Sequence, residues 1–291
     1  MNVEANLPFR PHTGNDRRMS LFMTLLVRDE QDIIEANLTA HLALGVDHII
    51  VTDNGSKDAT LDLIAPFAAE GLVTLWHEPQ DDYSQAEWVT RMARHAADRG
   101  ADWVINADAD EFWLPAEGTL SQTLSDLHPQ VSQVRAARHD FPPCDGPGPF
   151  WERMTVREAH STNAVGERLQ PKVCHRARRE ALVHQGNHAV SYVPGDVLFG
   201  PIEILHFPMR SYAQFENKIR NGGAAYARNT TLPFQIGHAW RTLYATWQDG
   251  GLPEFWRSRL LTPADRSAGL ASGDLVEDVR LKDYVRASAR L

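Results

Sequence analysis

The sequence predicts an α/β protein whose mainly parallel sheet is flanked by helices. Short apolar runs alternate with segments of helical periodicity over the first part of the chain. Glycine follows three of the helical segments, at Gly45, Gly71 and Gly100, where it favours the end of a helix. Polar, acidic clusters follow three of the apolar runs. Ligands of such sheets bind beyond the carboxyl ends of the strands, so these clusters should converge there.

Each element up to residue 108 is predicted from its own local pattern. The strands are Leu-, Ile- and Val-rich runs, which is typical of strands buried on both faces. Apolar residues such as Ile34, Leu38 and Leu42 recur at helical spacing, and Ser56 is placed to cap a helix. In chain order, we expect a strand over 21–27, a helix within 28–45, a strand over 47–53, a helix over 57–70, a strand over 72–77, a helix over 84–99 and a strand over 102–108.

The pattern changes after Leu114. Residues 142–149 are rich in proline and glycine and predict a long irregular connection. The chain then reads as strands broken by turns up to the segment LHFP, as a helix over 211–228, and as further helical pieces. We therefore expect a loose leader over 1–19 and a single domain over 20–291, whose parts are 20–114, 115–230 and a helical extension over 231–291.

Composition limits the possible functions. The chain has 291 residues, 43% of them hydrophobic, a net charge of −9 and a pI of about 5.8, so it is a poor candidate for binding nucleic acid or an anionic membrane. No apolar run is long enough for a transmembrane helix, and the first residues do not resemble a signal peptide. The expected location is the cytoplasm, with docking on a membrane through a partner as an alternative. Cys144 and Cys174 are expected to be free thiols, although one disulfide between them stays open.

The stretch WVINADADEFW places three acids directly after a predicted strand. Asp108 and Asp110 are one residue apart and can both reach one divalent cation, because Mg²⁺ and Mn²⁺ prefer oxygen ligands and keep positions for phosphates. The alternative is that they cap the next turn. Burying adjacent acids without partners is costly, so positive charges should lie beside them.

A second acidic position ends another predicted strand. Asp53 precedes an Asn-Gly turn, where its carboxylate is placed to accept hydrogen bonds from a base or from ribose hydroxyls. The alternative is a turn aspartate that bonds its own backbone. The sequence contains neither GxGxxG after the first strand nor GxxxxGK[ST], so any phosphate must be held by a metal and by basic side chains.

The segment LLVRDEQDIIEANLTAHLALGVDHIIVTDNGSKDAT, followed by NADADEFW, resembles the family-two-like glycosyltransferases. The resemblance covers residues 21–114 and, weakly, LHFPMRSYAQFENKIRNGG over 205–223. It implies a GT-A-type, Rossmann-like fold, with a nucleotide-sugar-binding half over 20–114 and an acceptor-binding half over 115–230. It also implies a nucleoside diphosphate sugar as donor, with a UDP-sugar favoured, and Mn²⁺ or Mg²⁺ as cofactor.

The resemblance also implies roles for single residues. Asp110 would coordinate the metal, and His206 would complete the metal site. The residues implied to bind the donor are Arg28 and Glu30 at the end of the first strand, Asp53 at the base or ribose, Asp108 at the ribose or sugar, and Arg210 and Lys218 at the diphosphate.

The catalytic base has no clear motif in this sequence. An inverting transfer needs a base, because the acceptor hydroxyl loses a proton as it attacks. The candidates are Asp140, Glu152, His188 and Glu203, and His188 is preferred because histidine titrates near neutral pH. Inverting and retaining chemistry both stay open. Trp113 is a candidate to stack on a sugar ring, with a place in the core as the alternative.

The expected function is transfer of a sugar from a nucleoside diphosphate sugar to a hydroxyl of a glycan, lipid or protein, as in hexosyltransferases. Two alternatives remain. A nucleotidyltransferase would normally have a glycine-rich basic loop after the first strand, where this chain has VRDEQD. A non-catalytic nucleotide- or sugar-binding protein would not consume the donor.

Overall fold

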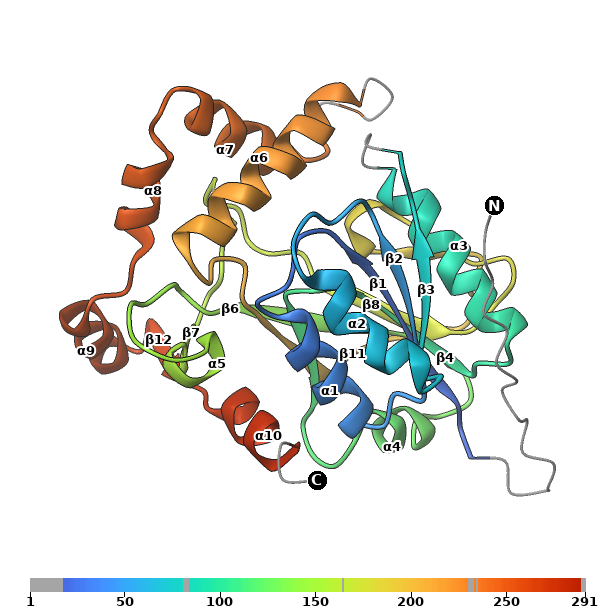
Figure 1. The fold of residues 1–291 in the computed structure, drawn as a ribbon. Coiled ribbons are helices and arrows are strands. Elements are labelled where there is room, and N and C mark those ends of the chain that lie inside the picture. The colour runs from blue at the N-terminus through green and yellow to red at the C-terminus, as the bar shows by residue number, and fades with distance from the viewer. Residues whose placement is uncertain (1–17, 81–83, 164, 230–232, 234, 289–291) are drawn as a thin grey trace.

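The computed structural model describes residues 18–80, 84–163, 165–229, 233 and 235–288 (Figure 1). Most of the leader expected over 1–19 therefore lies outside the described residues. The order of strands in the main sheet is β3-β2-β1-β4-β8-β6-β11-β5. These strands are β1 (Leu21–Val27), β2 (His48–Asp53), β3 (Val73–His77), β4 (Trp103–Asp108), β5 (Glu111–Pro115), β6 (Val131–Asp140), β8 (Lys172–Arg176) and β11 (Asp196–His206).

The sheet is parallel in its first half and mixed in its second half. Strands β3, β2, β1 and β4 pair in parallel, as do β6 and β11. Strand β8 runs antiparallel to both β4 and β6, and β5 runs antiparallel to β11. Strand β8 thereby joins the two halves, because it lies between β4 and β6.

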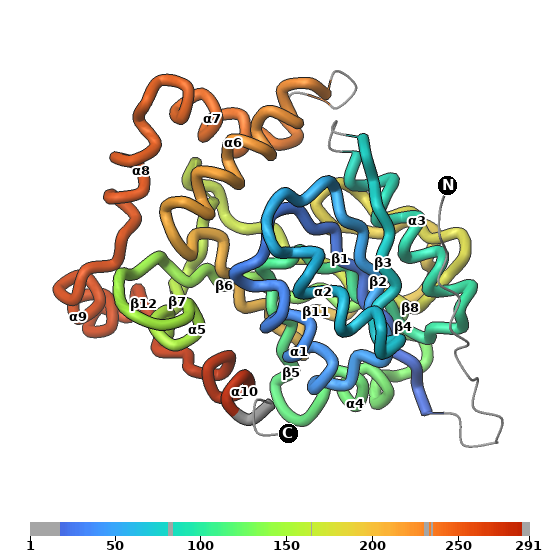
Figure 2. The backbone as a smooth tube through the Cα atoms, viewed as in Figure 1, coloured from blue at the N-terminus to red at the C-terminus, as the bar shows by residue number. Residues whose placement is uncertain are grey.

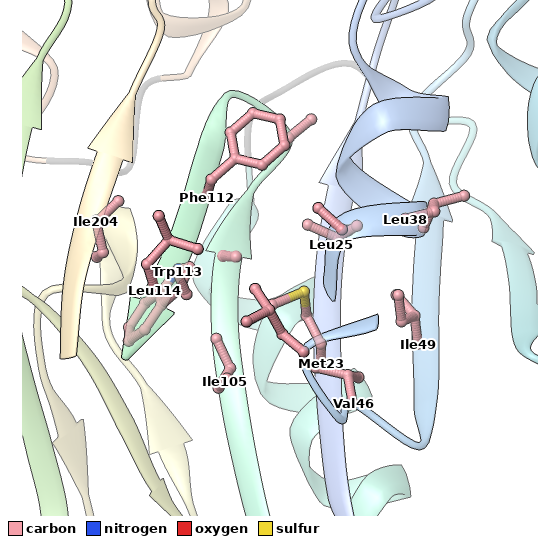
Figure 3. Close-up of a cluster of buried hydrophobic side chains, with 14 of the residues drawn as sticks. Met23, Leu25, Leu38, Val46, Ile49, Ile105, Phe112, Trp113, Leu114 and Ile204 are labelled. Atoms are coloured by element: carbon pink, nitrogen blue, oxygen red, sulfur yellow. The ribbon is translucent and has the colours of Figure 1, made fainter. Parts of the chain in front are cut away.

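Helices cover both faces of the sheet. On one face, α1 (Ile34–Ala43) and α2 (Thr60–Ala69) pack with α4 (Leu120–Ser125) on Leu21, Met23, Leu25 and other residues of one large core (Figure 3). On the other face, α3 (Gln85–Asp98) packs on Phe22, Ile50 and Val104, together with the hairpin of β9 (Leu182–Val183) and β10 (Val190–Ser191). Alternate residues of β1 thus enter different cores, as the two-residue period of a strand requires.

The C-terminal part wraps around one side of the molecule. Figure 2 shows the chain passing from α6 (Tyr212–Arg228) through α7 (His238–Gln248), α8 (Leu252–Arg259) and α9 (Pro263–Ser272) to α10 (Arg280–Ser288). A separate apolar cluster, which includes Phe215, Leu243 and Trp256, joins α6, α7 and α8. The remaining elements of the fold are α5 (Phe150–Arg153), β7 (Val156–Glu158), η1 (Gln185–Asn187) and β12 (Leu275–Glu277), which pairs with β7.

The α/β class, the flanking helices and the C-terminal helical additions are confirmed. Each expected element of the first half is present, and the strands begin and end within one residue of expectation. Both cysteines are free thiols. The division into parts at residues 114 and 230 stays a prediction.

Candidate active site

The carboxyl ends of three parallel strands bring the predicted polar clusters to one edge of the sheet. The register pairs Val27 of β1 with Asp53 of β2, and Leu26 of β1 with Asp108 of β4. The residues that follow β1, β2 and β4 therefore lie side by side. The convergence expected from the strand pattern is confirmed.

Asp108 and Glu111 are met by a buried lysine. Lys172, the first residue of β8, is 1% exposed, and its Nζ lies 2.5 Å from Asp108 Oδ2 and 3.1 Å from Glu111 Oε1. Arg138 adds a second cation, 3.4 Å from Glu111 Oε1. Desolvation raises the pKa of Asp108, but the charges of Lys172 and Lys218 and the hydrogen bond from Lys172 together outweigh it, and the pKa lies below its ordinary value. Asp108 is therefore ionised at neutral pH.

Asp110 is met by two other groups. Its Oδ2 accepts a hydrogen bond from Lys218 on α6 and lies 3.5 Å from His206 Nε2 at the end of β11. Burial opposes ionisation, yet Lys218 and His206 hold the pKa of Asp110 well below its usual range. The acids of the DADE stretch (residues 108–111) thus meet the positive charges that the sequence predicts, from four distant segments.

His206 has a geometry that fits a metal ligand. Its Nδ1 lies 2.6 Å from Asp140 Oδ1, so the ring is oriented by a carboxylate and Nε2 faces Asp110. This is the usual arrangement of a metal-binding histidine, whose second nitrogen is bound to a carboxylate. Burial lowers the pKa of His206, but Asp140 and Asp110 raise it to about 9.

Asp110 and His206 would provide two protein ligands, and the described residues hold no cluster of three or more His, Cys, Asp or Glu side chains able to bind a metal. Two ligands are enough for Mg²⁺ or Mn²⁺ in a nucleotide site, since substrate phosphates and water fill the remaining positions. A separation of 3.5 Å between Asp110 Oδ2 and His206 Nε2 is compatible with both atoms binding one ion. The residues present therefore fit a divalent cation.

Glu30 and Arg210 bind each other instead of facing an open site. Arg210 is 2% exposed, and its guanidinium lies 2.6 Å from Glu30 and 2.8 Å from Asp32 and donates to the carbonyl of Phe207. Burial raises the pKa of Glu30 despite the charge of Arg210. This geometry favours a role for Arg210 in fixing the start of α6, rather than direct contact with a diphosphate. Arg28 is partly exposed beside these residues at the end of β1.

Asp53 is engaged by its own turn. Its two carboxylate oxygens accept hydrogen bonds from the backbone N–H groups of Gly55 and Ser56, at 3.1 to 3.4 Å. The side chain is 3% exposed. The structure therefore shows the turn interaction that was the alternative to donor binding, and the donor role of Asp53 stays a prediction.

The base candidates fall into two groups. Glu152 lies 3.0 Å from Arg286 and Glu203 lies 2.9 Å from Arg280, so both bind the C-terminal segment. Asp140 and His188 lie nearer to the acids, as the contact of Asp140 with His206 and the influence of Asp108 on His188 indicate. Burial, with the charges of Lys172 and Arg138, lowers the pKa of His188 to about 4. His188 is therefore neutral at pH 7.

The expectation that Trp113 stacks on a sugar is wrong. Trp113 is 0% exposed and lies in the large core beside Leu114 and Ile204 (Figure 3). Its strand, β5, pairs with β11 at Ile204, and the indole packs inside the protein. No sugar can reach it without unfolding this strand.

Several residues of the site were not predicted from the sequence. Lys172 and Asn187 approach Asp108 from segments that follow it by more than 60 residues, and Gln85 approaches it from the start of α3. Asn187 has a left-handed backbone, with φ 59°. The one available signal was Lys172 itself, a charged residue that directly precedes the apolar pair Val173 and Cys174.

Two cavities among the described residues lie away from these acids. One, of about 660 Å³, lies along α3 and includes Trp76, Arg91 and Leu182. The other, of about 430 Å³, lies between the Pro/Gly loop and the segment before α9, and includes Cys144, Arg153 and Leu261. Neither is lined by Asp108 or Asp110. None of the described helices is long and apolar enough to cross a membrane.

The chain is similar to solved glycosyltransferase structures at low sequence identity. TarS 1–349 from S. aureus is 10% identical, with a TM-score of 0.41 over 76% of this chain and 69% of that chain. Its complex with UDP-GlcNAc is 10% identical, with a TM-score of 0.42 over 80% and 73%. Glucosyl-3-phosphoglycerate synthase from M. tuberculosis, in complex with Mn²⁺, UDP and glucosyl-3-phosphoglycerate, is 21% identical, with a TM-score of 0.31 over 41% and 44%.

No curated protein matches the chain. The model of glycosyltransferase family 92 matches residues 25–240, which include the end of β1, the DAD stretch, His206 and all of α6. This match spans well over half of the sequence, so the glycosyltransferase assignment is confirmed, and family 92 takes the place of the family-two-like branch. The chain belongs to glycosyltransferase family 92.

Proposed function

We propose that this protein is a metal-dependent glycosyltransferase that moves a sugar from a nucleoside diphosphate sugar to a hydroxyl acceptor. The observation that carries the proposal is the pair formed by Asp110 and His206, with His206 oriented by Asp140. The pair lies at the carboxyl edge of the sheet, where ligands of α/β folds bind. A bound Mn²⁺ or Mg²⁺ would supply positive charge that stabilises the departing nucleoside diphosphate.

The protein's own groups prepare this site in three ways. Asp140 holds a proton at His206 Nδ1, so Nε2 is the atom that a metal can share with Asp110. Lys172 keeps Asp108 ionised and fixed, with Gln85 and Asn187 bonding its other oxygen. Asp108 is thereby kept as an ionised acceptor for hydroxyl groups of the donor.

Lys218 is the cation best placed to meet the diphosphate. It is 22% exposed, and it is held beside Asp110 with its ammonium 5.9 Å from the ring centre of Trp240. A metal on Asp110 would compete with this ammonium for the same oxygen. Lys218 would then be released toward the donor phosphates, as the resemblance implies.

We propose that His188 is the base that accepts the proton of the acceptor hydroxyl, with Asp140 as the alternative. The Nδ1 of His188 lies 3.0 Å from the carbonyl of Pro171 and must donate to it, because a carbonyl only accepts. This leaves the lone pair at Nε2. A pKa near 4 makes it a weak base at neutral pH. If His188 acts, His188→Gln lowers kcat strongly and moves the acidic limb of the pH–rate profile, whereas Asp140→Asn would also weaken metal binding.

Donor consumption tests the proposal. The protein would be incubated with UDP- and GDP-sugars and Mn²⁺, and release of the nucleoside diphosphate would be measured with and without EDTA. We expect release from one donor, UDP-sugars being favoured, that stops with EDTA and in Asp110→Asn. Binding of a donor without release, even with a broad panel of hydroxyl acceptors, would favour the non-catalytic alternative. Release of pyrophosphate from a nucleoside triphosphate would favour a nucleotidyltransferase.

A further inference from the structure

Helix α1 reaches the backbone on both sides of Asp110 through one buried amide. Asn37 is 0% exposed, and its Nδ2 donates to the carbonyl of Ala109 at 2.9 Å and to the carbonyl of Glu111 at 3.0 Å. These two carbonyls flank Asp110. Both N–H donors of the Asn37 side chain thus bind the turn that carries the Asp110 carboxylate.

His41, one turn further along α1, sets the orientation of that amide. The backbone N–H of Trp113 can only donate, and it lies 3.0 Å from His41 Nε2, so Nε2 must carry the lone pair. The proton is then on Nδ1, which lies 3.0 Å from Asn37 Oδ1 and 2.9 Å from the carbonyl of Asn37. Since Oδ1 accepts from His41, Nδ2 is the atom of the amide that faces the two carbonyls.

The segment that follows β11 also holds the turn that carries Asp110, and β11 ends with His206, the second proposed metal ligand. The N–H of Phe207 donates to the carbonyl of Asp110 at 2.9 Å, and Phe207 directly follows His206. Three consecutive carbonyls, at residues 109, 110 and 111, are therefore bound. The backbone of Asp110 has little freedom, and the separation between its carboxylate and His206 depends on these contacts.

We propose that Asn37 is a positioning residue for the metal and donor site, and that His41 acts by orienting Asn37. The inference rests on the proposed function of Asp110. Neither side chain touches the ligand, since both are 0% exposed and lie on the inner face of α1. Their effect passes through the backbone of residues 109–111 to the direction of the Asp110 carboxylate. Mutation of a residue that supports a metal ligand typically lowers the metal affinity 10- to 100-fold.

The test compares Mn²⁺ and UDP binding, by isothermal titration, in wild type, Asn37→Asp and Asn37→Ser. Aspartate has the size of asparagine but presents acceptors to both carbonyls, and serine keeps a single donor. We expect Asn37→Asp to weaken Mn²⁺ binding, measured with UDP present, by at least about tenfold, and Asn37→Ser to lie between it and wild type. If Asn37→Asp does not fold, Asn37→Ser carries the test alone.

Leu38→Ala is the matched control for loss of stability. Leu38 is the next residue of α1, is 0% exposed and belongs to the large core (Figure 3). We expect this variant to lower the melting temperature while changing Mn²⁺ affinity by less than about twofold. Folded Asn37 variants with wild-type affinity, or an equal loss in Leu38→Ala, would overturn the positioning role. Failure of the wild type to bind Mn²⁺ with any nucleotide would instead reject the proposed function on which it rests.

Discussion

Three adjacent acids of one stretch have three different surroundings. Glu111 is 0% exposed and bound by Lys172 and Arg138, Asp110 lies between Lys218 and His206, and Asp108 is partly exposed. Burial raises the pKa of Glu111, while cations lower those of Asp108 and Asp110. Glu111 is thus suited to holding Lys172 in place, and the two aspartates to binding a cation and polar groups of a donor.

Lys172 should be essential for stability as well as for the site. Replacing it by methionine would leave Glu111 buried beside Arg138 alone, and removal of one partner from a buried pair costs about 3–5 kcal/mol. Urea unfolding of Lys172→Met would measure this loss. The double variant Lys172→Met with Glu111→Gln should recover part of the stability, because the fully buried side chain at position 111 is then neutral. A loss below about 1 kcal/mol in the single variant would contradict the role of Lys172.

Lys218 should compete with the metal. We expect Lys218→Met to bind Mn²⁺ more tightly than wild type without nucleotide, because the ammonium no longer occupies Asp110 Oδ2. The same variant should bind the nucleoside diphosphate more weakly, by about tenfold, since a charge-assisted contact is lost. Arg220→Met, which removes an exposed cation from the same helix, is the control. Unchanged Mn²⁺ affinity in Lys218→Met would show that the lysine does not compete.

At the scale of elements, α6 is tied to the carboxyl edge of the sheet by polar contacts. Asn217 and Asn221 donate to Asp29 at 3.0 and 2.9 Å, and Arg210 binds Glu30 and Asp32 just before the helix begins. The opposite face of α6 packs on α7 and α8. The position of Lys218 therefore depends on polar contacts on both sides of it in the sequence, at Arg210 and Asn217 before it and at Asn221 after it.

Arg210→Met should loosen α6. The substitution leaves Glu30 without its closest cation and removes the bonds to Asp32 and to the Phe207 carbonyl, so we expect a loss of roughly 2–4 kcal/mol. Hydrogen exchange should accelerate in the first turns of α6 more than in β4. Arg210→Lys should rescue little, because lysine cannot reproduce the forked contacts of arginine. Equal acceleration throughout the sheet would indicate general destabilisation instead.

The elements of the first half were predictable because each buried strand and each helix has a local pattern with a glycine or a polar stop. The second half was not, because its strands owe their form to pairing with distant partners. Strand β5 begins one residue after Asp110 and is antiparallel to β11, and no local signal separates it from β4. In the site, the aspartates were found from their position at strand ends. Lys172 and Asn37 were not, since their roles arise from contacts across 64 and 72 residues.

For the whole molecule, buried neutral histidines should make the protein sensitive to acid. Burial lowers the pKa of His41 and His175 to about 4 from 6.5, and both are 0% exposed. Between pH 6.5 and about 4, these two histidines bind protons in the unfolded chain but not in the folded protein, so the free energy of unfolding falls as the pH decreases. At pH 4.5 the loss should be on the order of 2–3 kcal/mol for each histidine. Urea unfolding at pH 7 and 4.5 measures it.

A variant separates this effect from the titration of carboxylates. His175→Gln removes one titrating group, so it should lose less stability than wild type between pH 7 and 4.5. His128 is exposed, so His128→Gln serves as the control. An identical pH dependence in wild type and His175→Gln would contradict a neutral, buried His175.

The most direct test of the metal-bridged donor site is isothermal titration of the purified protein with UDP and GDP, in Mn²⁺ and then in EDTA, with Asp110→Ala alongside. The site described above predicts that one nucleotide binds in Mn²⁺, that EDTA abolishes the binding, and that Asp110→Ala weakens it by about 10- to 100-fold or more. Tight binding that neither EDTA nor Asp110→Ala changes, or no binding of either nucleotide, would contradict it. The acids beside β4 would then serve only to stabilise the turn that follows this strand.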